Sequence, residues 1–172
     1  MEAIRLRRLA PADIVGLQKL SRQTFTETFA DSNTEEDMQQ YLNESFSAAK
    51  LGAELNNDGS VFYGAESGGE MIGYLKVNFG GAQTELKDSE GMEIERIYVV
   101  RDFLGKKVGP MLFAKAVEMA IMKGLKYVWL GVWEENARAI SFYKKNGFVE
   151  FDRHIFKLGS DEQIDIMMKR IL

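Results

Sequence analysis

The run KYVWLGVW (126–133) constrains the fold more than any other part of the sequence, because almost every residue in it is apolar and several are β-branched or aromatic. A strand with one face in water alternates apolar and polar residues, so a continuous apolar strand is covered on both faces. The run therefore predicts a central strand. The segment before it, GPMLFAKAVEMAIMKG (109–124), carries apolar residues at helical spacing and predicts an amphipathic helix.

The rest of the chain predicts further strands and helices, without a repeat, a linker or a low-complexity stretch. Two glycines, Gly68 and Gly69, fit the turn of a hairpin. Strands are expected at 3–9, 61–67, 70–79, 92–100, 148–158 and 163–172. Helices are expected from Pro11 onward, at 34–42, at 47–55 and at 136–147. This order of elements indicates a single α/β domain with a mixed sheet over residues 1–172.

Composition narrows the classes of function. The 172 residues include no cysteine, which excludes disulfides and a thiol nucleophile. They include one histidine, His154, which is interpreted as structural. A single histidine excludes a polyhistidine metal site, and no metal is expected. The net charge of −4 argues against a nucleic-acid partner and fits a cationic ligand. There is no apolar run of roughly 18 residues and no signal-peptide core, so no membrane partner and a cytoplasmic location are expected.

The segment LGKKVGP (104–110) joins a predicted strand to the helix at 109–124. A helix N-terminus presents unpaired N–H groups and a partial positive charge, and a glycine-containing loop lets those donors close around a phosphate. The loop matches neither a Walker loop nor the Rossmann spacing. It predicts either a phosphate site to which two lysines add charge, or a plain strand-to-helix turn with solvated lysines.

Two pairs of side chains are candidates for chemistry. Asn136 and Tyr143 lie nearly two helical turns apart and share a helix face, although they could also be an N-cap and a core aromatic residue. Glu93 and Glu95 lie two residues apart on a strand and point to the same face, although they could also form a polar surface that neutralises Arg96. Close carboxylates would raise the pKa of one of them toward the working range of a base.

The sequence contains the runs WLGVWEENARAISFYKKNGF (129–148), IDIMMKRIL (164–172) and TFTETF (24–29). These runs, the loop and the order of elements resemble the GCN5-related N-acetyltransferase (GNAT) family. Within that family they are similar to the bacterial PaiA group of spermidine and spermine N-acetyltransferases. The resemblance covers the whole chain. It implies a GNAT fold, in which a mixed, mostly antiparallel central sheet of about seven strands is flanked by helices.

The resemblance also implies an acetyl-CoA-dependent enzyme that needs no metal. Backbone groups of Ile97 and Val99 would bind pantetheine and polarise the thioester carbonyl, and Asn136 would hydrogen-bond CoA. The loop that would hold the pyrophosphate consists of Leu104, Gly105, Lys106, Lys107, Val108 and Gly109.

The catalytic roles follow from the same resemblance. Only a neutral amine attacks a thioester, so Glu93 or Glu95 would take a proton from the bound ammonium. Tyr143, a phenol with a pKa near 10, above the value of about 8.5 for a thiol, would supply a proton to the departing CoA thiolate.

The loop departs from the family pattern at two positions. Leu104 stands where Gln or Arg is usual, and Lys107 stands where Gly is usual. Pro110 also lacks an N–H that could reach a phosphate. The charge of Lys106 and Lys107 could offset these losses, so acetyl-CoA is still expected to bind. The departure also fits the alternative of a non-catalytic acyl-CoA-binding module.

The acceptor is expected to be a small primary amine, most of all a polyamine. No Lys or Arg occurs from Gln23 to Ala49, where the family lines its acceptor side, and Glu27 is the leading candidate to bind the acceptor. The acidic residues of this segment are Glu27, Asp31, Glu35, Glu36, Asp37 and Glu44. The alternatives are a solvated helix face, another small amine or a protein amine as acceptor. A homodimer is common in the family.

Overall fold

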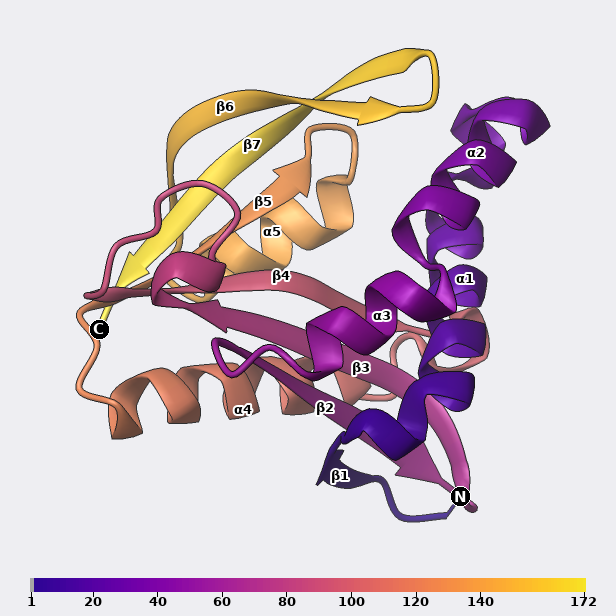
Figure 1. Ribbon diagram of the computed structural model, residues 1–172. Coiled ribbons are helices and arrows are strands. Elements are labelled where there is room, and N and C mark those ends of the chain that lie inside the picture. The colour runs from indigo at the N-terminus through magenta and orange to yellow at the C-terminus, as the bar shows by residue number, and fades with distance from the viewer. Residues whose placement is uncertain (1) are drawn as a thin grey trace.

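The computed structural model describes residues 2–172, which form a seven-stranded sheet with helices on both faces (Figure 1). The strands are β1 (Arg5–Arg8), β2 (Ser60–Ser67), β3 (Glu70–Phe79), β4 (Gly91–Val99), β5 (Tyr127–Trp133), β6 (Val149–Leu158) and β7 (Asp161–Ile171). The helices are α1 (Ile14–Phe29), α2 (Glu35–Ser45), α3 (Ala48–Leu55), α4 (Val108–Met122) and α5 (Ala137–Lys145). The strand order is β1-β2-β3-β4-β5-β7-β6. The predicted α/β class and the mixed, mostly antiparallel sheet are confirmed.

Both faces of strand β3 are covered, which explains why its residues from 72 to 78 are all buried. Gly73 faces α4, and a side chain there would contact Val108 and Leu112 of that helix. Lys76 faces the opposite way and approaches Glu54 of α3. Figure 1 shows α4 on one side of the sheet and α1 and α3 on the other. The face toward α1 and α3 is the one that carries buried polar groups.

Strand β5 lies between β4 and β7, as the apolar run predicted for a central strand. Its parallel pairing with β4 covers only Gly91–Ile94 opposite Tyr127–Leu130. Residues 96–99 of β4 continue to pair with β3, but residues 95–99 have no partner on β5 among residues 2–172. The two strands therefore separate toward their C-terminal ends, and the backbone edges that they leave unpaired face the opening between them.

A β-bulge interrupts β4 at the start of this opening. Arg96 lies opposite Lys76 and Ile94 lies opposite Val77, so Glu95 is an extra residue without a partner on β3. A bulge changes the local twist of the strand and re-aims the side chains beside it. As a result, Glu95 and Arg96 both direct side chains to the α1 and α3 face, where simple alternation would send them to opposite faces.

Some element boundaries differ from the predicted ones. Strand β1 covers only Arg5–Arg8 of the expected 3–9, because it is an edge strand that pairs with β2 over four residues. Helix α2 extends to Ser45, beyond the expected end at 42, and begins after Thr34, whose hydroxyl oxygen accepts the Asp37 N–H at 3.1 Å. The predicted hairpin turn is confirmed: Gly68 and Gly69 adopt φ values of +60° and +78°.

Candidate active site

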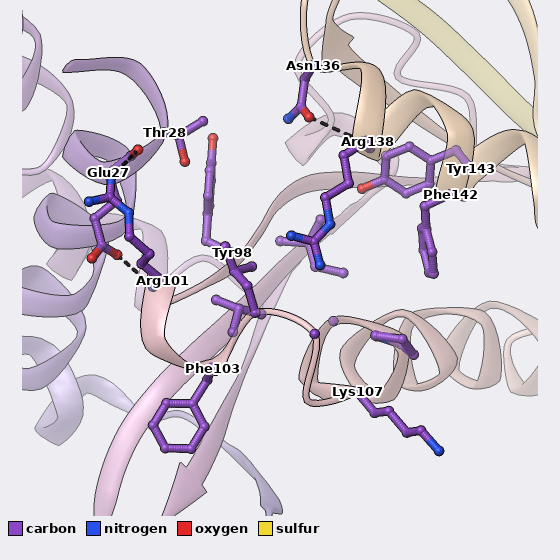
Figure 2. Close-up of a pocket in the computed structure, with 17 residues that line it drawn as sticks. Glu27, Thr28, Tyr98, Arg101, Phe103, Lys107, Asn136, Arg138, Phe142 and Tyr143 are labelled. Atoms are coloured by element: carbon purple, nitrogen blue, oxygen red, sulfur yellow. Dashed lines mark hydrogen bonds between the residues drawn. The ribbon is translucent and has the colours of Figure 1, made fainter. Parts of the chain in front are cut away.

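The opening between β4 and β5 leads into a cavity of about 510 Å³, called the cleft below (Figure 2). Its walls come from the end of α1, the last residues of β4, the loop before α4 and the first turns of α4 and α5. Ile97 and Val99 line it, as expected for backbone groups at the unpaired edge of β4. In an antiparallel pair, alternate residues direct N–H and C=O groups away from the partner strand, so β4 presents such groups to the cleft.

The glycine-containing loop lies at one end of the cleft. Of its six predicted residues, Leu104, Gly105, Lys107 and Gly109 line the cleft, whereas Lys106 and Val108 do not. The Lys106 ammonium lies over the ring of Phe103, 4.9 Å from its centroid, and Val108 is 1% exposed in the core. The N–H groups of the first turn of α4 have no carbonyl partner within the helix, which leaves them available to an anion.

Lys107 precedes α4 with a φ of +68°, in the left-handed region. A residue other than glycine costs roughly 1–2 kcal/mol in this conformation. The loop therefore keeps the backbone shape of a glycine-containing anion loop although a lysine occupies the position. In Figure 2 the Lys107 side chain extends away from the centre of the cleft.

Asn136 and Tyr143 lie on the opposite wall of the cleft and share one face of α5. The side-chain oxygen of Asn136 accepts the Ala139 N–H at 3.2 Å, so this residue is an N-cap and also lines the cleft. The ring of Tyr143 packs among Phe113, Phe142 and Phe148. Figure 2 shows the Tyr143 hydroxyl directed into the cleft. Burial raises the pKa of Tyr143 well above its ordinary value, so the phenol keeps its proton at neutral pH.

Arg138 was not predicted, yet its guanidinium reaches into the cleft between Tyr98 and Tyr143 (Figure 2). It lies in the first turn of α5, where a positive charge opposes the helix dipole. An anionic ligand at the helix N-terminus would offset the unfavourable interaction between this charge and the helix dipole. An arginine in the first turn of a predicted helix could therefore have indicated an anion-binding site from the sequence.

A second cavity of about 310 Å³, called the aromatic cavity below, lies on the α1 and α3 face of the sheet. Tyr98 lines both the cleft and the aromatic cavity, so the two adjoin at that residue. The aromatic walls are Phe25, Phe29, Tyr41, Phe46, Tyr98, Trp129, Trp133 and Phe156, and the charged or titratable side chains are Glu85, Glu93, Glu95, Arg96, His154 and Asp165. Because these residues come from many separate segments, no local sequence pattern unites them.

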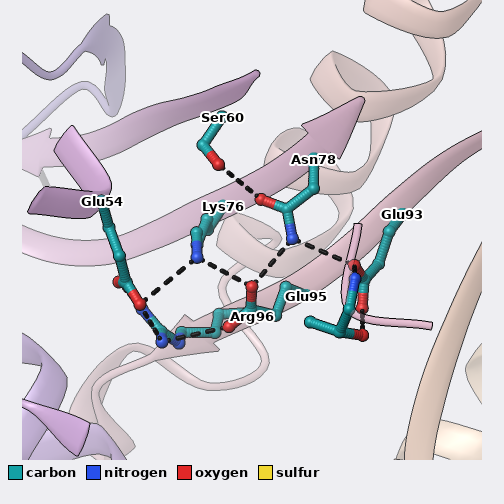
Figure 3. A network of polar contacts seen from close by, with 8 residues as sticks. Glu54, Ser60, Lys76, Asn78, Glu93, Glu95 and Arg96 are labelled. Carbon is teal, nitrogen blue, oxygen red and sulfur yellow. Dashed lines mark hydrogen bonds and ion pairs between the residues drawn. The ribbon is translucent and has the colours of Figure 1, made fainter. Parts of the chain in front are cut away.

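Glu95 belongs to a network of ion pairs under the aromatic cavity (Figure 3). Its carboxylate lies 2.7 Å from Lys76 Nζ and 3.0 Å from Arg96 Nη2. Glu54 contacts the same two cations, so the two positive and two negative charges balance. Burial acts to raise the pKa of Glu95, but Arg96 and Lys76 outweigh it and bring the pKa to about 2. Glu95 is therefore ionised and already paired, which makes it a weak base.

Glu93 lies beside this network without contacting its cations, as Figure 3 shows. Its carboxylate accepts hydrogen bonds from Asn78 Nδ2 at 3.0 Å, from the Thr84 N–H at 2.8 Å and from the Thr84 hydroxyl at 2.6 Å. Burial raises the pKa of Glu93, and the charge of Glu95 adds to this effect, while the hydrogen bonds oppose it. The pKa values of the two predicted glutamates are therefore shifted in opposite directions, upward for Glu93 and downward for Glu95.

Glu27 lines the cleft and is absent from the lining of the aromatic cavity. Its carboxylate accepts the Arg101 N–H at 3.0 Å, and the Arg101 guanidinium donates to the Glu27 carbonyl oxygen at 3.1 Å. These bonds tie the end of α1 to the turn that follows β4. Its expected contact with the acceptor stays a prediction.

Two further findings concern residues 2–172 as a whole. They contain no group of three or more His, Cys, Asp and Glu side chains arranged to hold a metal ion. None of their helices combines the length and the hydropathy needed to cross a bilayer.

Comparison with known proteins identifies the family. The model of the acetyltransferase (GNAT) family matches residues 15–148. Over all 172 residues the chain is 38% identical to an uncharacterized N-acetyltransferase in the pepI 3′ region of Lactobacillus delbrueckii subsp. lactis and covers 99% of it. It is 28% identical over 150 residues to spermidine N(1)-acetyltransferase of Thermoplasma acidophilum, with 85% of this chain and 88% of that protein covered. The crystal structure of PaiA N-acetyltransferase from Thermoplasma acidophilum in complex with coenzyme A superposes with a TM-score of 0.81 at 25% identity, and the match covers 99% of each chain.

These matches agree with the geometry of the cleft. The cleft opens where two parallel strands separate, and the unpaired edge of β4 faces it. The N-terminus of α4, which follows a glycine-containing loop, faces the same cavity. The chain belongs to the acetyltransferase (GNAT) family, and it is an N-acetyltransferase that uses acetyl-CoA as its acetyl donor.

Proposed function

We propose that the acceptor is a polyamine or a related short diamine, which binds in the aromatic cavity and is acetylated where that cavity meets the cleft. The observation that carries this proposal is the composition of the aromatic cavity, which combines carboxylates with many aromatic rings next to the acetyl-CoA side. Rings attract alkylammonium groups through cation–π interactions and also cover methylene chains.

The charges in the aromatic cavity favour a cation. Glu95 is neutralised within its network, but Glu85, Glu93 and Asp165 make no ion pair with Lys or Arg among residues 2–172. His154 lies close to two of these carboxylates, 3.1 Å from a Glu85 oxygen and 3.5 Å from an Asp165 oxygen. Burial raises the pKa of Asp165, and Glu85 adds to this effect against the influence of His154. An ammonium group that does not react would be stabilised beside these two carboxylates.

In the proposed reaction, Glu93 takes a proton from the ammonium that does react. The neutral amine attacks the thioester carbonyl carbon, the C–S bond breaks as the intermediate collapses, and the amine nitrogen releases its second proton to solvent. Tyr143 donates one proton to the CoA sulfur, and the resulting phenolate takes up a proton from solvent. Backbone groups of Ile97 and Val99 hold pantetheine and polarise the carbonyl.

The proposed contacts with CoA itself lie at the two helix N-termini. The pyrophosphate lies against the first turn of α4, where the loop residues Leu104 to Gly109 present N–H groups. Asn136 contributes a hydrogen bond, and Arg138 adds a positive charge from the facing helix. Glu27 contacts the acceptor from the rim of the cleft.

A matched pair of amines tests the acceptor. 1-Aminopentane replaces the second ammonium of 1,4-diaminobutane by a methyl group, so the two differ mainly in charge. Spermidine and 1,4-diaminobutane should show kcat/KM values at least about tenfold above that of 1-aminopentane in a thiol-release assay, and added salt should reduce the difference. Equal kcat/KM values for all three, or a peptide amine used as well as spermidine, would contradict a polyamine acceptor and leave the acetyltransferase assignment intact.

Two further expectations accompany this proposal. A homodimer is tested by light scattering of the purified protein, and a cytoplasmic location by cell fractionation.

A further inference from the structure

The loop between β3 and β4 (residues 80–90) reaches the aromatic cavity and contacts Glu93 directly. Thr84 in this loop donates both its backbone N–H, at 2.8 Å, and its hydroxyl, at 2.6 Å, to the two oxygens of the Glu93 carboxylate. The remaining hydrogen bond to this carboxylate comes from Asn78 at 3.0 Å. One residue of a loop therefore supplies two of the three hydrogen bonds that Glu93 accepts.

The loop is anchored beside Glu93 by Gln83, which is 1% exposed. Its side-chain oxygen accepts from the Trp129 indole N–H at 2.6 Å, and its side-chain nitrogen donates to the Asp88 carbonyl oxygen at 2.8 Å. Trp129 is the residue opposite Glu93 in the pairing of β4 with β5. A buried amide with partners on both sides is held firmly, since breaking either bond would leave a buried polar group unpaired.

We propose that Thr84 is a positioning residue for Glu93, with its hydroxyl holding the carboxylate in one orientation at the wall of the aromatic cavity while Gln83 fixes Thr84 in place. This inference rests on the proposed role of Glu93 as the base. Thr84 acts through the carboxylate that it binds. The same loop brings Glu85 to the aromatic cavity, so its placement serves both residues.

Thr84 also affects the protonation of Glu93. A hydrogen bond to a carboxylate favours its ionised form. The Thr84 bonds counteract the burial that raises the pKa of Glu93. Removal of the hydroxyl should therefore raise that pKa further. The other charged or titratable groups that face Glu93 would be unchanged by such a substitution: Lys76 on β3, Glu85 in the loop, Glu95 and Arg96 on β4, His154 on β6 and Asp165 on β7.

The test compares two substitutions of one side chain. Thr84→Val keeps the shape and the backbone N–H but removes the hydroxyl; it should lower kcat/KM at neutral pH by about tenfold and move the acid limb of its pH profile to higher pH. Thr84→Ser keeps the hydroxyl and should restore the wild-type profile. Thr26→Val, at an exposed position on α1, is the control for the loss of a threonine hydroxyl elsewhere and should behave as wild type. The Kd of acetyl-CoA should not change in any of the three.

Glu93→Gln, measured in the same assay, separates this inference from the proposed function. If Glu93→Gln is as active as the wild-type protein, Glu93 is not the base, and the role of Thr84 falls with it. If Glu93→Gln loses activity but Thr84→Val keeps the wild-type pH profile, the inference about Thr84 alone is overturned. The combined variant Thr84→Val/Glu93→Gln should be no less active than Glu93→Gln, since Thr84 acts through Glu93.

Discussion

The cleft and the aromatic cavity meet at Tyr98 but are built in different ways. The cleft is formed mainly by two neighbouring strand-loop-helix units, and much of what it offers is backbone: the unpaired edge of β4 and the first turns of α4 and α5. The aromatic cavity is formed by side chains from α1, α2, the 80–90 loop and strands β4 to β7. The first site depends on local chain geometry and the second on which side chains the fold brings together.

This difference explains how the loop before α4 can depart from the family pattern at Leu104 and Lys107 while the chain still belongs to the GNAT family. Lys107 keeps the left-handed backbone of a glycine-containing turn, so the N–H groups of α4 keep their orientation. Substitutions in a backbone site should therefore change binding by small factors. Substitutions of side chains that exchange protons should change turnover by large factors.

The largest expected effect comes from Tyr143, the side chain of the cleft that we propose to take part in proton transfer. Tyr143→Phe removes the hydroxyl and little volume, so kcat should fall by about 100-fold or more while the Kd of acetyl-CoA stays within about twofold. Steady-state kinetics and calorimetric titration measure the two quantities, with Tyr63→Phe, outside both cavities, as the control. An unchanged kcat would remove Tyr143 from the reaction and leave the cleft as a purely backbone site.

The next effect separates the two glutamates on β4. Glu93→Gln removes the proposed base and should lower kcat by roughly 10- to 100-fold with little change in the thermal midpoint. Glu95→Gln should instead destabilise the fold by on the order of 3 kcal/mol, because Lys76 and Arg96 keep only Glu54 as an anionic partner. A larger loss of kcat in Glu95→Gln than in Glu93→Gln, with both proteins folded, would reverse the assignment of the base.

The difference in stability between the wild-type protein and Glu95→Gln should also depend on pH. The pKa of Glu95 is about 2 in the folded protein, below its value in the unfolded chain. Its stabilising effect is therefore complete above the unfolded value and is lost as pH falls toward the folded one. Melting curves of the wild-type protein and Glu95→Gln should accordingly converge between about pH 4 and pH 2.

The smallest expected effect concerns Lys107. Lys107→Gly removes the strain of a left-handed conformation at a residue with a Cβ, and it lets a phosphate approach the backbone N–H groups more closely. Acetyl-CoA should therefore bind about threefold more tightly, a gain of roughly 0.6 kcal/mol. Lys107→Ala removes the same charge but keeps a Cβ, which separates charge from backbone access. Weaker binding with a reduced salt dependence in both variants would show that the lysine charge, and not the backbone, dominates at this position.

Much of the fold was predictable because local patterns determine it. The apolar run at 126–133 identified a central strand, which lies between β4 and β7, and Gly68 and Gly69 identified a hairpin whose backbone requires positive φ. Four of the six loop residues and the pair Asn136 and Tyr143 line the cleft, and spacing and resemblance could locate them because each group lies within one continuous segment. Boundaries were less predictable, because the length of β1 depends on how far β2 accompanies it.

The tertiary structure alone decided the chemistry of the aromatic cavity. The sequence placed Glu93 and Glu95 on one strand but could not distinguish them. The difference arises from Lys76 on β3, from Arg96, which the bulge turns to the same face as Glu95, and from Thr84 in the loop before β4. The bulge that re-aims the side chains beside Glu95 is equally invisible in the sequence, because it is a property of the register between β3 and β4. Spacing along a chain determines which face a residue occupies, whereas the charges and hydrogen-bond donors around a carboxylate, and hence its pKa, depend on residues that only folding makes its neighbours.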